Sequence, residues 1–319
     1  MPADAFLILG FGGPETSSEV MPFLRKVTAG RGVPDERLQA VARQYDSVGG
    51  ASPLNSHTRA LVAAVEHRLR DAGDTRPVYY ANRNTAPYVA DVVAAMAGDG
   101  VGKATVFVPS AFPSYSGCRQ YLEDLEGAAL SAATAAPILR KVAPFARHRG
   151  YLNPLLDAAR ESRRRLGPDA VLLASAHSLP APMAARCAYE AELHVAMNAI
   201  SVGAGFARAE LAFQSRSGRP EDPWLGPDVG QQVATLAAQG VRAVVVAPIG
   251  FVHDHMEVIY DLDQVLVPQA EALGLEVERI VTPGSDPRFV EMVAELLQSD
   301  DGLETTAVTA CGPGRCASR

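Results

Sequence analysis

The chain has 319 residues with a formal net charge of −7, and 48% of the residues are hydrophobic and 20% charged. This length suits two domains of roughly 150 residues, the composition is that of a globular protein, and the negative charge argues against binding to nucleic acid. No apolar run reaches the ~18 residues that a membrane-spanning helix needs, which leaves at most a peripheral contact with a membrane. The N-terminus lacks the basic start of a signal peptide, so we expect a cytoplasmic protein.

Apolar runs typical of buried strands alternate with segments of helical periodicity along the chain. We predict strands at residues 5–9, 77–81, 104–108, 138–142, 171–175, 207–213, 241–248 and 275–281. We predict helices at 18–27, 34–45, 55–72, 87–97, from 120 onward, at 153–166, 183–201, 229–238, around Glu257 and at 287–298. This alternation predicts an α/β protein with parallel sheets, in two similar halves. We place the N-terminal half at 1–148, the C-terminal half at 149–298 and a tail without periodicity at 299–319.

Two segments place titratable groups where a predicted strand ends. His177 follows the strand at 171–175, and a run with His253 and Glu257 follows the apolar residues 243–248. Ligand sites of open parallel sheets lie at the carboxyl ends of the strands. His253 and Glu257 are four residues apart and could share a helix face. The alternatives are a buried structural histidine at 177 and an exposed helix carboxylate at 257.

The four cysteines are Cys118, Cys187, Cys311 and Cys316. In a cytoplasmic protein they should be thiols or metal ligands, because structural disulfides are rare there. Cys311 and Cys316 could ligate a soft metal. On spacing alone, an exposed tail is the simpler interpretation.

Four separated segments, in the same order, give the chain a family resemblance. They are GGASPLN at 49–55, SAHSLP at 175–180, DPWLGPD at 222–228 and GFVHDHMEVIYD at 250–261. Together they resemble ferrochelatases, which insert ferrous iron into a porphyrin during haem synthesis. The resemblance implies two Rossmann-like halves with a porphyrin cleft between them. It also implies that His177 and Glu257 are the catalytic pair and the ligands of the incoming iron.

The residues at this pair suit the chemistry of metal insertion. The porphyrin must lose two pyrrole protons, and either a neutral imidazole or a carboxylate can accept a proton or ligate iron. Which of His177 and Glu257 does which stays open. Asp254, Asp261 and Asp263, together with Glu257, could form an acidic relay from the surface.

The resemblance extends to residues that would bind the porphyrin. Ser52 and Tyr121 match positions that touch porphyrin propionates in bacterial members, and Tyr45 and Arg31 lie in nearby matching loops. Phe11 takes the place of a tyrosine that ligates iron axially in some members. Phenylalanine has no donor atom, so the resemblance implies a porphyrin contact at Phe11 without ligation.

The GGPE loop at 12–15 and the SGCRQY segment at 116–121 look most like actinobacterial ferrochelatases. That branch metallates coproporphyrin III, which we therefore favour as the substrate, with Fe²⁺ as the second substrate. The alternatives are protoporphyrin IX, a chelatase for another tetrapyrrole or metal, and a haem-binding module of the same fold.

Many actinobacterial members also hold a [2Fe-2S] cluster through one mid-chain and three C-terminal cysteines. Cys118, Cys311 and Cys316 occupy corresponding places in this sequence, whereas the fourth position is Thr309 and Cys187 matches none. The resemblance therefore implies a possible cluster with three of its four usual ligands.

Overall fold

A computed structural model describes residues 2–30, 32–132, 136–217 and 221–305. These residues form two compact units. Of the described residues, unit 1 contains those up to Pro109, those in Gln120–Ala143 and those at 293–305, and unit 2 contains Ser110–Arg119 and those in Pro144–Met292. The predicted boundary at residue 148 assigns Ser110–Arg119 to the N-terminal half and residues 293–305 to the C-terminal half or the tail, whereas the two units contain these segments the other way round.

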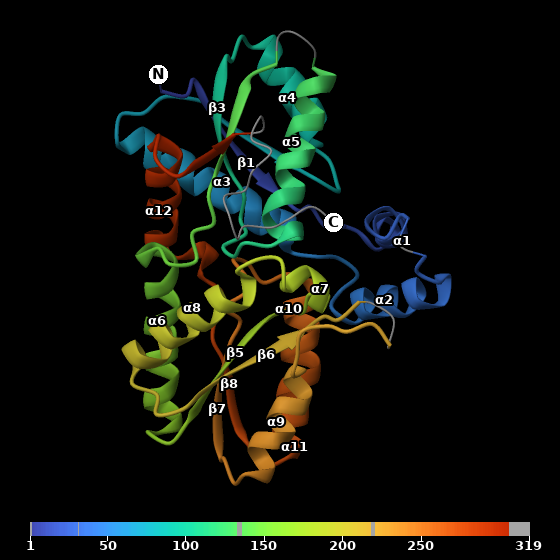
Figure 1. The fold of residues 1–319 in the computed structure, drawn as a ribbon, viewed down its shortest axis with the longest axis vertical. Coiled ribbons are helices and arrows are strands. Elements are labelled where there is room, and N and C mark those ends of the chain that lie inside the picture. Colours follow the sequence, from blue (N-terminus) through green and yellow to red (C-terminus); the bar gives the residue numbers. More distant parts are fainter. Residues whose placement is uncertain (1, 31, 133–135, 218–220, 306–319) are drawn as a thin grey trace. The chain divides into compact units, whose positions relative to one another are not determined.

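Unit 1 contains a five-stranded sheet (Figure 1). Its strands, in spatial order, are β2 (Val78–Asn82), β1 (Ala5–Gly10), β3 (Lys103–Phe107), β4 (Ile138–Val142) and β9 (Leu303–Thr305). The first four are parallel, and β9 pairs antiparallel with β4. Its helices are α1 (Ser17–Val27), α2 (Asp35–Ser47), α3 (Leu54–Asp71), α4 (Val89–Gly98), α5 (Gln120–Ser131) and the end of α12 (Pro287–Gln298).

The alternation of side chains along β1 explains how this sheet is covered. Every residue of β1 is buried, so helices must cover both faces. Leu7 and Leu9 pack in one core cluster with Val93 of α4 and Leu125 of α5, and these two helices lie side by side in Figure 1. The residues of β1 that alternate with Leu7 and Leu9 point to the opposite face of the sheet. The helix α3 contacts both β1 and β2.

Unit 2 contains a four-stranded sheet in which all strands are parallel. The strands, in spatial order, are β6 (Ala209–Gln214), β5 (Val171–His177), β7 (Ala243–Ala247) and β8 (Glu276–Arg279). Its helices are η1 (Tyr115–Arg119), α6 (Arg149–Leu166), α7 (Ala181–Ala184), α8 (Tyr189–Ala204), α9 (Val229–Ala238), α10 (Met256–Val258), η3 (Ile259–Leu266), α11 (Val267–Ala272) and η4 (Pro283–Ser285). The predicted fold class, two α/β halves built on parallel sheets, is confirmed.

Two predicted helices differ from the structure. The single helix expected at 183–201 is interrupted and forms α7 and α8. The helix expected around Glu257 is a short α-turn, α10, followed by the π-helix η3. π-helical turns are rare and occur frequently at functional sites, and hydrophobic spacing alone does not distinguish them from α-turns. His253 lies in the loop before α10, so the prediction that it shares a helix face with Glu257 is wrong.

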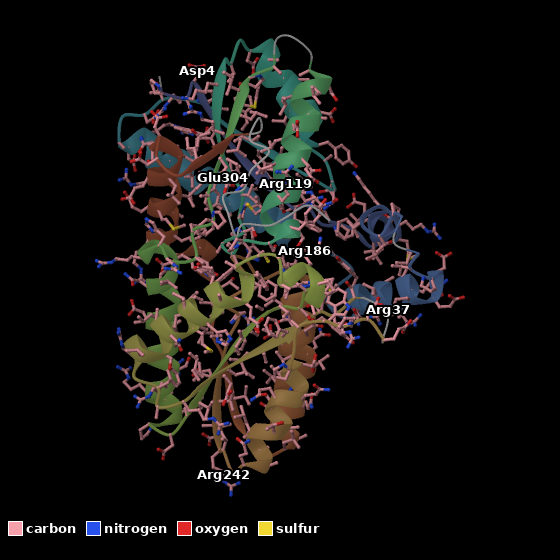
Figure 2. The ribbon with its side chains drawn as sticks, in the orientation of Figure 1. Asp4, Arg37, Arg119, Arg186, Arg242 and Glu304 are labelled. Carbon is pink, nitrogen blue, oxygen red and sulfur yellow. The ribbon has the colours of Figure 1, made fainter. Side chains whose placement is uncertain are left out.

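Part of the predicted tail is a strand. Glu304 of β9 is labelled in Figure 2. It pairs in register with Lys141 of β4, and their side chains form an ion pair with a 2.8 Å Nζ–Oε2 distance. Lys141 is only 2% exposed. A three-residue strand is too short to give a pattern in the sequence, which is why the tail was predicted from residue 299. Residues 306–319 lie outside the described part of the chain.

Among the helices of the described residues, none combines the length and the hydrophobicity that crossing a bilayer would require.

Candidate functional site

His177 is the last residue of β5, and its ring is held in a defined tautomer. Nδ1 lies 2.6 Å from the carbonyl oxygen of Ser178. A carbonyl oxygen only accepts hydrogen bonds, so Nδ1 carries a proton, and in the neutral form of the ring Nε2 keeps a lone pair. This Nε2 lies 3.6 Å from Oε2 of Glu257. With a neutral ring, two acceptors face each other, and a proton or a cation would fit between them. With a protonated ring, the two side chains form an ion pair.

The backbone around His177 is fixed by neighbouring elements of unit 2. The hydroxyl of Tyr189, at the start of α8, donates to the carbonyl oxygen of His177 at 3.0 Å. The amide of Ser178 donates to the carbonyl oxygen of Gln214 at the end of β6, and its hydroxyl donates to that of Leu225. The segment at 222–228, which belongs to the family pattern, thus supports the loop after His177.

Glu257 lies in α10, and the loop before this helix passes close to β5. The amide of Gly250 donates to the carbonyl oxygen of Ser175, and a Cβ at residue 250 would lie 2.7 Å from the Cα of Ala176. Only glycine fits so close to the strand. Burial raises the pKa of Glu257, whereas the nearby His177 opposes this rise. The side chain keeps 40% of its surface accessible, so the carboxylate can be reached from outside.

His255 belongs to the same site, although the sequence analysis gave it no role there. Its Nδ1 accepts a hydrogen bond from the amide of Glu257 at 3.2 Å and so caps α10. Burial, together with the nearby His177, lowers the pKa of His255 to about 3. The ring is therefore neutral near pH 7. The signal in the sequence was the position of His255 two residues before Glu257, an acidic residue in the first turn of the helix.

Of the predicted acidic relay, Asp261 alone joins Glu257 near His177. Asp261 accepts a hydrogen bond from Ser215, and burial raises its pKa while Ser215 and His177 oppose the rise.

The other two aspartates of the relay belong to a different cluster. Asp254 and Asp263 both pair with Arg279, at 2.8 and 2.7 Å, so one guanidinium offsets part of the charge of these two carboxylates. The four acidic residues of the predicted relay thus fall into two groups, with Glu257 and Asp261 near His177 and with Asp254 and Asp263 at Arg279. Within the described ranges, no group of three or more His, Cys, Asp or Glu side chains is arranged to hold a metal ion. His177 and Glu257 face each other as a pair of possible donor side chains.

The predicted porphyrin contacts lie in unit 1 and differ in exposure. Phe11, after β1, is 41% exposed and packs edge-on against Phe23. Ser52 and Tyr45 are 7% and 6% exposed, and the Ser52 hydroxyl accepts from the amide of Leu54. Arg31 lies outside the described residues.

Tyr121 is more deeply buried than Phe11, Ser52 and Tyr45. It is 4% exposed and belongs to the core cluster of unit 1, with the guanidinium of Arg83 over its ring. Burial raises the pKa of Tyr121 to about 12, although the charge of Arg83 opposes this. Contact with a propionate would require this hydroxyl to become accessible.

Of the three predicted cluster ligands, Cys118 is buried in η1, and Cys311 and Cys316 fall outside the described ranges. Cys187 lies in the interruption between α7 and α8 and is partly exposed.

The fold is that of a known tetrapyrrole chelatase. SirB from Bacillus subtilis with Fe³⁺ matches 92% of this chain and 95% of its own, with a TM-score of 0.55 and 12% identity. The sirohydrochlorin chelatase SirB of a Bacillus subtilis subspecies, in complex with cobalt, matches 93% of this chain and 97% of its own, with a TM-score of 0.52 and 11% identity. At this level of identity the likeness concerns the fold alone.

The sequence defines the family. Residues 3–301 match the ferrochelatase family, and the chain belongs to it. Similar proteins include the coproporphyrin III ferrochelatase of Mycolicibacterium smegmatis, 44% identical over 93% of this chain and 89% of that protein. That of Frankia alni is 47% identical, over 97% of this chain and 84% of its own length. The family resemblance predicted from the four segments is confirmed.

Proposed function

We propose that this chain inserts Fe²⁺ into coproporphyrin III and so produces Fe-coproporphyrin III in haem b biosynthesis. The observation that carries the proposal is the facing pair of His177 Nε2 and Glu257 Oε2 in a member of the ferrochelatase family. The choice of porphyrin is supported by the relatives named coproporphyrin III ferrochelatase, which are 44–47% identical. The cytoplasmic location and a peripheral membrane contact stay predictions.

The reaction exchanges two pyrrole protons for one Fe²⁺, so the site must accept protons while it handles a cation. The lone pair on His177 Nε2 can accept a proton or ligate iron. Glu257 can do the same, and its raised pKa brings it closer to working pH than an ordinary carboxylate. Placing both acceptors on one side of a bound macrocycle would draw protons away without bulk base. Asp261 provides a second carboxylate along the route of the cation.

For the porphyrin itself, we propose contacts in unit 1. Phe11 is supported by its exposure, which offers an apolar ring face to a macrocycle. Ser52, Tyr45, Tyr121 and Arg31 are proposed from the family pattern. If Tyr121 binds a propionate, Tyr121→Phe should raise the KM for coproporphyrin about tenfold, the effect of one lost hydrogen bond to a charged acceptor. Unchanged kinetics would remove Tyr121 from the site.

The decisive experiment is anaerobic Fe²⁺ insertion, followed by porphyrin absorbance, with coproporphyrin III and protoporphyrin IX compared at equal concentrations. We expect faster turnover of coproporphyrin III. A preference for protoporphyrin IX would favour the protoporphyrin alternative. Binding of either porphyrin without insertion, with Fe²⁺ or Co²⁺, would instead favour a haem-binding module or a chelatase for another tetrapyrrole.

We also propose that Cys118, Cys311 and Cys316 hold a [2Fe-2S] cluster. The support is the family pattern together with the burial of Cys118, which shields a thiolate from solvent. A cluster would supply folding free energy through thiolate ligation. Iron and acid-labile sulfide are measured in anaerobically purified protein and in Cys311→Ser. Sulfide near zero in the wild type would refute the cluster, whereas the chelatase proposal would stand.

A further inference from the structure

The peptide unit between His177 and Ser178, at the end of β5, is held by hydrogen bonds at both of its ends. Its carbonyl oxygen accepts from the hydroxyl of Tyr189 at 3.0 Å. Its amide, that of Ser178, donates to the carbonyl oxygen of Gln214 at 2.8 Å. The strand β7 pairs with β5 only as far as Ala174, so His177 lies beyond the last residue that this strand holds. There the hydroxyl of Tyr189 fixes the carbonyl oxygen.

The peptide unit between Ile249 and Gly250, just after β7, is held in the same way. Its carbonyl oxygen accepts from the hydroxyl of Tyr151 in α6. Its amide, that of Gly250, donates to the carbonyl oxygen of Ser175 at 3.0 Å. A peptide unit is planar, so two hydrogen bonds at opposite ends fix its rotation. This unit begins the loop that leads to Glu257.

The ring of Phe112 joins the two tyrosines into one aromatic cluster, which consists of Phe112, Tyr151 and Tyr189. Phe112 meets each tyrosine ring edge-on, with ring centroids 6.1 Å apart in both pairs, and this is a favourable geometry for aromatic rings. All three residues are buried and belong to unit 2. Burial raises the pKa of both hydroxyls, so each keeps the proton that it donates. The same cluster therefore fixes the backbone before Glu257 and at His177.

The hydroxyl of Tyr189 reaches the imidazole of His177 through the next carbonyl group. Nδ1 of His177 donates to the carbonyl oxygen of Ser178, and only the two backbone torsions of Ser178 separate this carbonyl from the fixed peptide unit. The hydroxyl of Ser178 donates to the carbonyl oxygen of Leu225, which restricts these torsions further. A carbonyl held in this direction keeps a proton on Nδ1 and leaves Nε2 facing Glu257.

We propose that Tyr189 and Tyr151 are positioning residues for metal insertion. Tyr189 holds His177 in the tautomer with its proton on Nδ1, and Tyr151 holds the start of the loop that carries Glu257. This inference rests on the proposed metal insertion and deepens it. Each hydroxyl acts through a backbone carbonyl. Its removal lets one member of the catalytic pair move relative to the other, which slows the transfer of protons or metal and leaves porphyrin binding unchanged.

Tyr189→Phe and Tyr151→Phe test this role, because each variant loses one hydroxyl and keeps its ring. The kcat for Fe²⁺ insertion should fall about tenfold in each, the rate equivalent of one hydrogen bond. The KM for coproporphyrin III should stay within about twofold of wild type. Tyr79→Phe is the matched control. It removes a hydroxyl that donates to the exposed Asp99 in unit 1, and it should leave both constants unchanged.

The kinetic assay is run well below the thermal midpoint of each variant, which separates positioning from stability. A lower midpoint with unchanged kcat in both variants would make the aromatic cluster purely structural and overturn the proposal. A rise in the KM for coproporphyrin III as large as the fall in kcat would also overturn it.

Nitrogen-15 NMR of histidine-labelled protein reads the tautomer of His177 without any substrate. Spectra are recorded at about pH 8, above the ordinary pKa of histidine, and His177→Ala identifies the two resonances of this ring. Wild type should show a protonated Nδ1 and an unprotonated Nε2. In Tyr189→Phe the two resonances should move toward each other as the tautomers mix, whereas Tyr151→Phe should leave them in place. Unchanged resonances in Tyr189→Phe would overturn its role.

The two measurements also separate this inference from the proposed function. A wild type that inserts no metal, together with the expected change of the His177 resonances in Tyr189→Phe, would refute the proposed function and leave the positioning of His177 intact. An active wild type with an unchanged kcat in both tyrosine variants would overturn the positioning role alone.

Discussion

Nε2 of His177 faces Oε2 of Glu257 at 3.6 Å, while Nδ1 of the same ring donates to the carbonyl of Ser178. The hydrogen bond at Nδ1 decides which nitrogen is available for chemistry. A neutral imidazole in this tautomer can do nothing with Nε2 except accept a proton or bind a cation. A proton or a cation placed between the two facing atoms would interact with both of them.

Replacing His177 with alanine should abolish metal insertion, because it removes the Nε2 lone pair. Porphyrin binding, measured by fluorescence quenching, should stay close to wild type. His194→Ala is the matched control, since His194 is an exposed histidine of the same unit. More than a tenth of wild-type turnover in His177→Ala would exclude His177 from the reaction.

Glu257→Gln should eliminate most turnover without loss of stability, and its effect on stability should depend on pH. The folded protein raises the pKa of Glu257 above its ordinary value of 4.5, so the folded state binds this proton more tightly than the unfolded state. Wild-type stability must then fall as the pH rises above 4.5. Glutamine carries no such charge. We expect thermal midpoints that coincide near pH 4.5 and favour the glutamine variant at pH 8; the opposite order would make Glu257 a structural ion-pair partner.

His255 should destabilise the protein in mild acid. Its pKa is about 3 when folded against an ordinary 6.5, so the unfolded state takes up a proton that the folded state refuses. Stability present above pH 6.5 is therefore lost as the pH falls toward 3. His255→Asn can keep the cap on α10, because asparagine is a strong N-cap residue, and removes this titration. Its thermal midpoint should decline less than that of wild type between pH 7 and pH 5. Parallel declines would contradict the burial of a neutral ring.

Glu304→Ala should destabilise unit 1. It leaves Lys141, 2% exposed, without its carboxylate partner, and an unpaired buried charge costs about 3 kcal/mol or more. Chemical denaturation should show an earlier transition. Glu276→Ala removes an exposed carboxylate from a strand of unit 2 and should cause only a small shift. Equal midpoints for the two variants would mean that β9 contributes little to the sheet.

The sequence predicted those features that repeat over several residues or depend on position along a strand. β4 and α9 have the predicted bounds, whereas β5 extends two residues further than predicted and ends at His177, and Glu257 lies in the first helix after β7. The π-helix η3 could not be predicted, because it keeps the apolar spacing of an α-helix. Ser215 could not be predicted either, because its contact with Asp261 joins residues 46 apart in the sequence and depends on a single backbone torsion.

The antiparallel strand β9 has a consequence for the order in which the chain folds during synthesis. Domains fold as units while the chain emerges, with N-terminal parts usually first. Unit 1 contains the first residues of the chain, but β9 completes its sheet only after residues 303–305 have been made. Until then β4 presents an open edge, and Lys141 lacks its carboxylate partner Glu304. All four strands of unit 2 lie before residue 280, so its sheet can form on the ribosome while that of unit 1 is still incomplete.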